Sequence, residues 1–499
     1  MTPGERLVGG ARRALLPLAL GAVAALGQAP VGFWPATLLA LALLLRHASG
    51  GRASRGSARF TAFWAGAGYF AATLFWIVEP FFVEPERDAW MAPFALIFMA
   101  LGGGLFWGAA GWLADRAPPG PLRAAGLALG LVLSDLARSY LFTGFPWVLL
   151  GHVWIATPVA QAAAFAGPIG LSILTVALAL LLSRARPVPV LSALALTAAV
   201  WGGGLWRLSR PEPPRDPAIR VRLVQPNATQ ALKWLPGMWD TFLDRMIAAT
   251  GAPTDKPLSL IVWPETSIPW LLDQAQPILE EAALAANGTP LAIGLQRGDG
   301  ARYYNTLAII DDAGQATQLY DKTHLVPFGE YVPFADQLGV TAFAARAGNG
   351  YSAGSGPTVL DLGPVGRVLP LICYEAVFPQ DLRAAEAAHG RADWILQVTN
   401  DSWFGRLSGP WQHAAQARLR AIEQGLPLLR DANTGITVGY DAKGRELGRL
   451  AQESVGYLDL DVPGALPPTV YARTGDGPAT FLLFLGLFWF GLATRRARG

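Results

Sequence analysis

Three segments of this 499-residue chain place reactive side chains where apolar strands are expected to end. Glu265 directly follows a proline after one apolar run, and Cys373, the only cysteine, ends another. Lys322 opens a segment that is rich in aromatic residues and stiffened by two prolines. Strand ends are where α/β folds carry reactive groups. Taken singly, each residue has a simpler explanation, as a loop carboxylate, a surface cation or a small buried hydrophobe.

Together the three residue types indicate acyl transfer. A cysteine attacks an acyl carbon only as the thiolate, so near neutral pH it needs a base, which Glu265 can supply. The oxyanion that forms needs fixed positive charge or N–H donors, and Lys322 with the backbone N–H after Cys373 meets that need. His324 is left out of the catalytic set because an isolated histidine is more often structural. A single cysteine excludes an internal disulfide and a cysteine metal cluster.

The composition predicts that much of the chain lies in a membrane. Hydrophobic residues make up 52% and charged residues 15%, against about 25% charged in ordinary soluble domains. Eight apolar stretches approach the length of about 20 residues that a spanning helix needs. They are 14–29, 31–46, 60–78, 91–113, 122–142, 166–183, 188–206 and 478–494. The first two could instead form one long broken helix.

Arginines mark every second connection between these stretches, which indicates that those connections face the cytoplasm. The basic residues are Arg6, Arg12, Arg13, Arg46, Arg52, Arg55, Arg59, Arg116, Arg123, Arg184, Arg186, Arg495, Arg496 and Arg498. The acidic loop with Glu79, Glu84 and Asp88 falls on the other side. The alternation predicts a membrane domain at 1–210 with seven spans, an external block after it, and an eighth span at 478–494. The short basic clusters do not form a nucleic-acid patch.

Residues 220–463 read as a water-facing α/β domain, because short β-rich runs alternate with helical stretches. The expected strands are Val221–Gln225, Leu258–Val262, Leu291–Gln296, Thr306–Ile310, Val368–Cys373, Trp394–Val398 and Ile436–Tyr440. The expected helices are 236–250, 274–287 and 411–425. Turn signals at Asp312–Gly314 and Asp441–Gly444 predict that some strands pair antiparallel.

Glu265, Lys322 and Cys373 occur in the order, and at the intervals, typical of the carbon–nitrogen hydrolase (nitrilase) superfamily. The chain resembles its membrane branch, the apolipoprotein N-acyltransferases, over essentially its whole length. The motifs that carry this resemblance are Phe142-Thr143-Gly144-Phe145-Pro146-Trp147, Trp263-Pro264-Glu265-Thr266, Lys322-Thr323-His324-Leu325-Val326-Pro327-Phe328-Gly329-Glu330-Tyr331-Val332-Pro333, Cys373-Tyr374-Glu375 and Thr399-Asn400-Asp401-Ser402-Trp403-Phe404-Gly405.

The resemblance implies an eight-span helical membrane domain joined to a nitrilase-like α-β-β-α sandwich. It also implies roles for individual residues. Glu265 would be the base, Lys322 the oxyanion stabiliser and Cys373 the nucleophile. The remaining residues it points to are the supporting Glu330 and Glu375 and the substrate-binding Trp234 and Tyr374.

The implied reaction is ping-pong, needs no cofactor or metal, and takes place at a bacterial inner membrane with the catalytic domain in the periplasm. A glycerophospholipid would donate an acyl chain to Cys373, and the amine of a diacylglyceryl-cysteine on an apolipoprotein would accept it. The protein is expected to be a monomer that binds no nucleic acid. Two alternatives remain open: a membrane-tethered nitrilase or amidase that hydrolyses a small amide, and a non-enzymatic transporter or lipid-binding scaffold.

The arginine alternation predicts the topology directly. A reporter fused near Gly300 is expected to be active only on the outer side of the membrane, and one fused to the C-terminus only in the cytoplasm. A cytoplasmic signal from the fusion near Gly300 would contradict the eight-span arrangement, because one missed span inverts everything after it.

Overall fold

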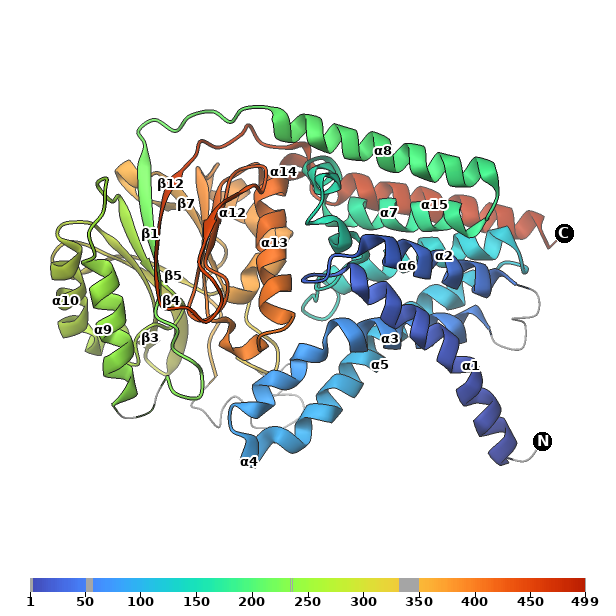
Figure 1. The fold of residues 1–499 in the computed structure, drawn as a ribbon, viewed down its shortest axis with the longest axis horizontal. Coiled ribbons are helices and arrows are strands. Elements are labelled where there is room, and N and C mark those ends of the chain that lie inside the picture. The colour runs from blue at the N-terminus through green and yellow to red at the C-terminus, as the bar shows by residue number, and fades with distance from the viewer. Residues whose placement is uncertain (1–2, 51–56, 234, 236, 332–349, 499) are drawn as a thin grey trace. The chain divides into compact units, whose positions relative to one another are not determined.

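The computed structural model describes residues 3–50, 57–233, 235, 237–331 and 350–498 (Figure 1). The chain forms two compact units. The first comprises Met1–Arg210, Leu407–Ala415 and Thr474–Gly499, and the second comprises Pro211–Arg406 and Gln416–Arg473.

Long helices make up the first unit, and one of them overlaps each stretch expected to span the membrane. They are α1 (Pro3–Ala24), α2 (Trp34–Ser49), α3 (Ala58–Thr73), α5 (Ala92–Ala114), α6 (Pro121–Tyr140), α7 (Ala163–Ser183), α8 (Pro187–Ser209) and α15 (Gly477–Arg496), with the short α4 (Pro85–Asp88) before α5. A 3₁₀ turn at Ala25–Gly27 follows α1, and α1 and α2 are separate helices that contact each other. The alternative of one long broken helix is therefore wrong.

Four of the described helical segments are long and apolar enough to cross a membrane: Pro85–Ala114, Pro158–Ser183, Pro187–Ser209 and Gly477–Arg496. A fifth is added if Ala58–Thr73 and Phe75–Phe82, which meet at a bend of 46°, count as one span. α2 and α3 each have 16 residues, which is short of a full span. These helices support a helical membrane unit, and the number of eight spans stays a prediction.

Glycines allow α1 and α3 to pack backbone to backbone. A Cβ atom added to Gly21 on α1 would lie 1.8 Å from the Ala65 carbonyl oxygen, and one added to Gly68 on α3 would lie 2.0 Å from the Leu18 carbonyl oxygen. Small residues at helix contacts are typical of membrane helix pairs, which gain stability from close van der Waals packing rather than from water exclusion.

An ion pair lies buried in the same unit. The Arg138 guanidinium donates to Asp135 Oδ1 over 2.9 Å, and to the carbonyl oxygens of Phe145 and Trp147 over 3.0 Å each. The other oxygen of Asp135 accepts from the Leu150 N–H over 2.8 Å. These bonds hold the Phe142–Trp147 motif, whose backbone is not helical, against α6. Both charges are compensated, as buried charges must be.

The second unit contains two six-stranded sheets with the orders β12-β1-β2-β3-β4-β5 and β11-β10-β9-β8-β7-β6. The strands of the first sheet are β1 (Ile219–Gln225), β2 (Leu260–Trp263), β3 (Leu291–Asp299), β4 (Arg302–Ile310), β5 (Ala316–Asp321) and β12 (Gly456–Val462). Those of the second are β6 (Leu360–Asp361), β7 (Arg367–Ile372), β8 (Trp394–Thr399), β9 (Leu428–Ala432), β10 (Val438–Tyr440) and β11 (Glu446–Arg449).

All seven strands expected from the sequence are present, and the two turn signals connect the antiparallel pairs β4–β5 and β10–β11. Five strands were not expected: β5, β6, β9, β11 and β12. Three expected helices are also confirmed, as α9 (Met238–Thr250), α10 (Gln276–Ala286) and α13 (Gly409–Gln424), while α12 (Pro379–His389) was not expected.

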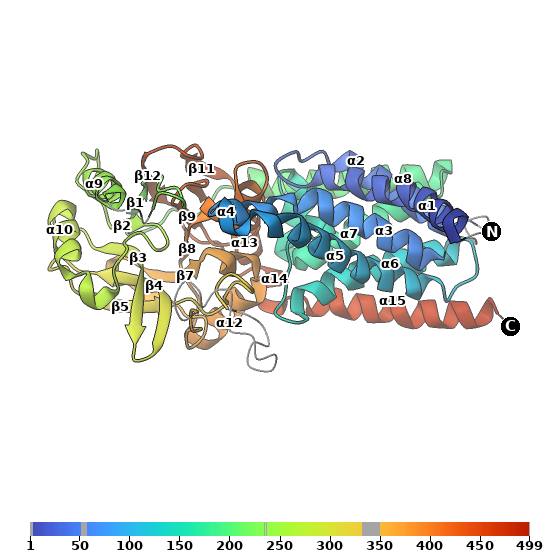
Figure 2. The same ribbon diagram turned by 90° about the horizontal axis from the view of Figure 1, so that it is seen from below.

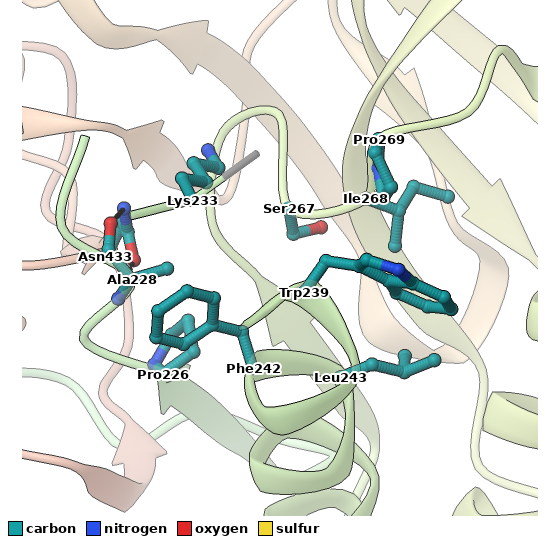
Figure 3. A pocket seen from close by; sticks show the side chains of 10 residues that line it. All are labelled: Pro226, Ala228, Lys233, Trp239, Phe242, Leu243, Ser267, Ile268, Pro269 and Asn433. Atoms are coloured by element: carbon teal, nitrogen blue, oxygen red, sulfur yellow. Dashed lines mark hydrogen bonds between the residues drawn. The ribbon is translucent and has the colours of Figure 1, made fainter. Parts of the chain in front are cut away.

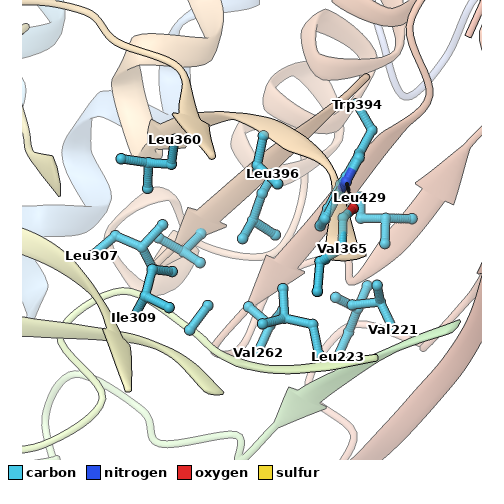
Figure 4. Packing of buried hydrophobic residues seen from close by; sticks show 14 of the residues in the cluster. Val221, Leu223, Val262, Leu307, Ile309, Leu360, Val365, Trp394, Leu396 and Leu429 are labelled. Carbon is cyan, nitrogen blue, oxygen red and sulfur yellow. Dashed lines mark hydrogen bonds between the residues drawn. The ribbon is translucent and has the colours of Figure 1, made fainter. Parts of the chain in front are cut away.

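The two sheets face each other across a shared apolar core, which Figure 4 shows in part. Side chains of the first sheet such as Val221 and Leu307 pack there with Trp394 and Leu396 of the second. α9 and α10 cover the outer face of the first sheet through a separate apolar cluster. Figure 2 shows α9 and α10, the first sheet, the second sheet and α12 as successive layers. The predicted α-β-β-α sandwich is confirmed.

This packing generates a stability prediction. Leu396 on β8 is fully buried between the sheets, so Leu396→Ala is expected to cost about 2–5 kcal/mol and to lower the melting temperature of the detergent-solubilised protein by at least about 4 °C. Leu284 on α10 is 82% exposed, and Leu284→Ala serves as the matched control. Equal melting temperatures for the two variants would contradict the shared core.

Candidate active site

Glu265 lies in the loop that follows β2 and is 6% exposed. Its Oε1 accepts a hydrogen bond from Asn305 Nδ2 over 2.7 Å, and its Oε2 accepts one from the Asn400 N–H over 2.7 Å. The next residue, Thr266, has φ +49°, which is rare for a β-branched residue and costs on the order of 1–3 kcal/mol. The carboxylate is therefore fixed from two sides by a strained turn and two short bonds.

Lys322 follows β5 and is 1% exposed. Its Nζ donates to Glu330 Oε1 over 2.7 Å and lies 3.6 Å from Glu265 Oε1. Burial by itself lowers the pKa of Lys322, but Glu330, Glu265 and Cys373 together raise it above its ordinary value. The side chain is therefore a buried cation at neutral pH, matched by two carboxylates.

Glu330 joins this cation to the loop that follows β5. Its second oxygen, Oε2, accepts from the Val326 N–H over 2.7 Å, and the Glu330 N–H donates in turn to the Val326 carbonyl oxygen over 2.9 Å. One carboxylate thus neutralises the ammonium and closes the turn around Val326. The supporting role of Glu330 stays a prediction.

Cys373 comes directly after β7 and begins a 3₁₀ turn. Its φ is +51°, a left-handed conformation that is uncommon away from glycine. The residue is 5% exposed. Burial and then the charge of Glu265 raise the pKa of the Cys373 thiol, while Lys322 and a hydrogen bond from Thr399 lower it; the net shift is upward. The thiol is therefore protonated near neutral pH and lies within the electrostatic reach of both predicted partners.

Glu375 is a buried acceptor that ties together the segments carrying Lys322 and Cys373. Its Oε1 accepts from the Tyr320 hydroxyl, the Thr323 N–H and hydroxyl, and the His324 N–H, and its Oε2 accepts from the Ile372 N–H. Burial raises the pKa of Glu375, and these hydrogen bonds oppose that shift. Glu375 thereby fixes the turn that carries the thiol of Cys373.

Of the two predicted substrate-binding aromatics, Tyr374 is described and Trp234 lies outside the described residues. Tyr374 is 4% exposed, and its ring packs edge-on against His324 and Phe378. His324 stacks on Phe378 and its Nδ1 is 2.9 Å from Asp381 Oδ2. His324 thus contacts Asp381 and Phe378.

The sequence analysis missed the groups that hold the carboxylate of Glu265. Asn400 stood in a recognised motif but was given no role, and Asn305 was not singled out at all. The only signal for Asn305 was a polar residue directly before the expected strand Thr306–Ile310. Lys233 was also missed: it is 3% exposed, and its Nζ lies 3.5 Å from the Glu265 carbonyl oxygen. Burial lowers the pKa of Lys233 and Glu265 offsets part of that shift, so that the pKa is about 8.

Lys233 also lines a small pocket beside the Glu265 loop, shown in Figure 3. Ser267, Ile268 and Pro269 from the same loop form one wall, and α9 contributes apolar side chains opposite them. The complete lining is Pro226, Ala228, Lys233, Trp239, Phe242, Leu243, Ser267, Ile268, Pro269 and Asn433. The loop that carries the predicted base Glu265 thus lies beside a pocket whose opposite wall consists of apolar side chains of α9.

The arrangement can support nucleophilic acyl chemistry. A thiol, a carboxylate able to take its proton, and a fixed cation for a developing oxyanion meet at the ends of strands from both sheets. No group of three His, Cys, Asp or Glu side chains in the described part of the chain is arranged to hold a metal ion.

The α-β-β-α sandwich agrees with the carbon–nitrogen hydrolase class, and residues 220–465 match the family model described as carbon-nitrogen hydrolase. Residues 20–181 match a second model, described as the apolipoprotein N-acyltransferase N-terminal domain.

Full-length relatives identify the family. The chain is 35% identical over 524 residues to an apolipoprotein N-acyltransferase of Rhodopseudomonas palustris, covering 97% of this chain and 95% of that one. It is 37% identical over 495 residues to one of Sinorhizobium fredii, covering 92% of each. The chain belongs to the apolipoprotein N-acyltransferase family. Among solved structures, a mutant amidase of Nesterenkonia AN1 from the nitrilase superfamily aligns at 20% identity with a TM-score of 0.39, over 53% of this chain and 96% of its own.

The electrostatics of the thiol generate a prediction. Lys322→Met removes the cation that lowers the pKa of Cys373, so less thiolate is present at a given pH. Alkylation by iodoacetamide near pH 8 is expected to slow about tenfold, with the midpoint of its pH profile moved upward. Because Cys373 is the only cysteine, intact mass reports this reaction without interference. Lys256→Met, at an exposed surface ion pair, is the control. An unchanged profile for Lys322→Met would show that this cation does not act on the thiol.

Proposed function

We propose that this protein is a membrane enzyme that N-acylates lipoproteins. It moves a fatty acyl chain from a glycerophospholipid, through a thioester on Cys373, to the N-terminal amine of diacylglyceryl-cysteine on an apolipoprotein. The observation that carries the proposal is the full-length relationship to apolipoprotein N-acyltransferases in a chain whose only thiol lies beside a buried acid and a buried lysine.

In the first half-reaction, the thiol proton of Cys373 passes to Glu265 as sulfur attacks the ester carbonyl carbon of the phospholipid. The oxyanion of the tetrahedral intermediate is stabilised by Lys322 and by the backbone N–H that follows Cys373. When the carbon–oxygen bond breaks, Glu265 returns the proton to the leaving glycerol oxygen. The products are a lysophospholipid and an acyl thioester.

In the second half-reaction, the lipoprotein amine attacks the thioester carbonyl carbon. Glu265 takes a proton from the attacking nitrogen, the carbon–sulfur bond breaks, and the thiolate of Cys373 recovers that proton. An amide is formed and the enzyme returns to its starting state. Excluding water from the buried thioester favours the amine over hydrolysis. This requirement separates the reaction from that of a membrane-tethered amidase, whose acceptor is water.

The other predicted residues have supporting roles in this scheme. Glu330 keeps Lys322 charged and in place, and Glu375 fixes the turn that carries Cys373. Tyr374 and Trp234 contact the substrates. The apolar helices suit an inner-membrane location, with several spans and the hydrolase unit in the periplasm, where the enzyme acts as a monomer without a cofactor.

The intermediate provides the decisive test. The wild-type protein given phospholipid alone is expected to gain one acyl mass that hydroxylamine removes, and added diacylated lipopeptide is expected to discharge it as a hydroxylamine-resistant amide. Cys373→Ala is expected to abolish both steps. Cys373→Ser is expected to be severely impaired, because a carboxylate is too weak a base to ionise an ordinary hydroxyl.

The products also separate the alternatives. A tethered amidase would release only free acid, and a non-enzymatic scaffold would give no product. If Cys373→Ala still transferred acyl chains at the wild-type rate, the proposed nucleophile and the proposed reaction would both be wrong.

A further inference from the structure

Asn305 is the one side-chain amide that donates to Glu265 among the described residues. Its Nδ2 lies 2.7 Å from Glu265 Oε1, and the residue is 2% exposed. It belongs to β4, whose odd-numbered residues Leu307 and Ile309 point into the core between the sheets, as does Cys373. Strand alternation places Asn305 on that same inner face, within the strand.

The backbone of Asn305 is tied to the predicted cation as well. Its carbonyl oxygen accepts from the Lys322 N–H over 2.8 Å. One residue therefore sets the position of the base through its side chain and of the lysine through its main chain. Asn305 uses only Nδ2 of its two side-chain polar atoms within the described part of the chain.

The Oδ1 atom of Asn305 is buried and accepts no hydrogen bond from any described residue. Burying a carbonyl oxygen without a donor costs free energy, so such an atom in a native site calls for a partner. The atom belongs to the same amide group that contacts Glu265. A ligand that carries an N–H or O–H group can supply this donor, and the carboxylate beside it favours a ligand that gives up a proton.

We propose that Asn305 binds the acceptor amine through Oδ1 while its Nδ2 holds Glu265. The side-chain amide of Asn305 thereby aligns the base Glu265 with the attacking amine. This inference rests on the proposed function and deepens it. An attacking primary amine carries two N–H bonds. One proton passes to Glu265 as nitrogen bonds to the thioester carbon and the carbon–sulfur bond breaks; the other N–H donates to Asn305 Oδ1 and stays with the amide product.

The proposal separates the two half-reactions. In Asn305→Ala, Glu265 loses a donor in both steps, so loading of Cys373 from phospholipid is expected to slow about tenfold. Discharge by lipopeptide is expected to slow at least about tenfold more, with a raised KM for lipopeptide and an unchanged KM for phospholipid. Rates are normalised to the fraction of Cys373 that loads at completion, which removes the effect of misfolded protein.

Asn305→Asp is the second variant and is nearly isosteric. It keeps an oxygen acceptor for the amine but loses the donor to Glu265 and sets a second carboxylate against it. Loading is expected to slow, while the KM for lipopeptide is not raised. Asn227→Asp is the matched control. Its Oδ1 is likewise buried without a partner among the described residues, but its Nδ2 donates to the Glu453 carbonyl oxygen instead of to Glu265, so both steps are expected to stay at the wild-type rate.

An unchanged lipopeptide KM in Asn305→Ala, or normal loading in both Asn305 variants, would overturn the inference. A wild-type protein that loads Cys373 but forms no amide would instead refute the proposed acceptor, and the loading rates of the variants would still report on how Asn305 holds Glu265.

Discussion

A buried ammonium group controls the site. The Nζ of Lys322 is removed from water, and a buried cation is tolerated only where carboxylates and hydrogen bonds replace its hydration. Glu265 and Glu330 meet that requirement, and in doing so they fix the loops after β2 and β5. The three groups carry one positive and two negative charges, so the cluster has a surplus of negative charge while Cys373 keeps its proton.

Burial, and then the charge of Glu265, explains why the thiol is not ionised in advance. A thiolate would add another negative charge to a desolvated cluster, and the pKa of Cys373 is raised accordingly. The proton therefore moves from sulfur to Glu265 as an acyl carbon is attacked, when charge passes to the oxyanion beside Lys322. A protonated thiol is also protected from oxidation and from stray electrophiles, because only the thiolate reacts rapidly.

The parts predicted from sequence are those that depend on local pattern. Apolar β-rich runs predicted β1, β2, β3, β4, β7, β8 and β10. β9 was missed because it contains Arg430 and Asp431, both fully buried. Arg430 is compensated by a bidentate pair with Asp401 at 2.8 and 2.9 Å, which no local pattern reveals. β5 was missed because three of its six residues are exposed and its apolar residues do not form a run.

The site residues also divide into those that local sequence reveals and those that only the tertiary structure reveals. Glu265, Lys322 and Cys373 have side chains whose chemistry is visible in sequence, and their order carried the resemblance. Asn305 acts through its side-chain amide and Asn400 through its backbone N–H. Both reach Glu265 only because the fold brings strands from two sheets together. The span count is limited for a physical reason too. α6 carries Arg123, Asp135 and Arg138, and the composition cannot show that Asp135 and Arg138 pair with each other inside the helix.

The two bonds to Glu265 come from opposite halves of the sandwich. Asn305 belongs to the first sheet, whereas Asn400 follows β8 of the second and is anchored by the neighbouring Arg430–Asp401 pair. The position of the Glu265 carboxylate therefore depends on the spacing between the two sheets. Any slippage or swelling of the core that lengthens either bond displaces the base from its working position while strands and helices stay formed. Heat inactivation of this enzyme should then precede its unfolding, and a ligand that wedges the sheets apart would inhibit it without touching the thiol.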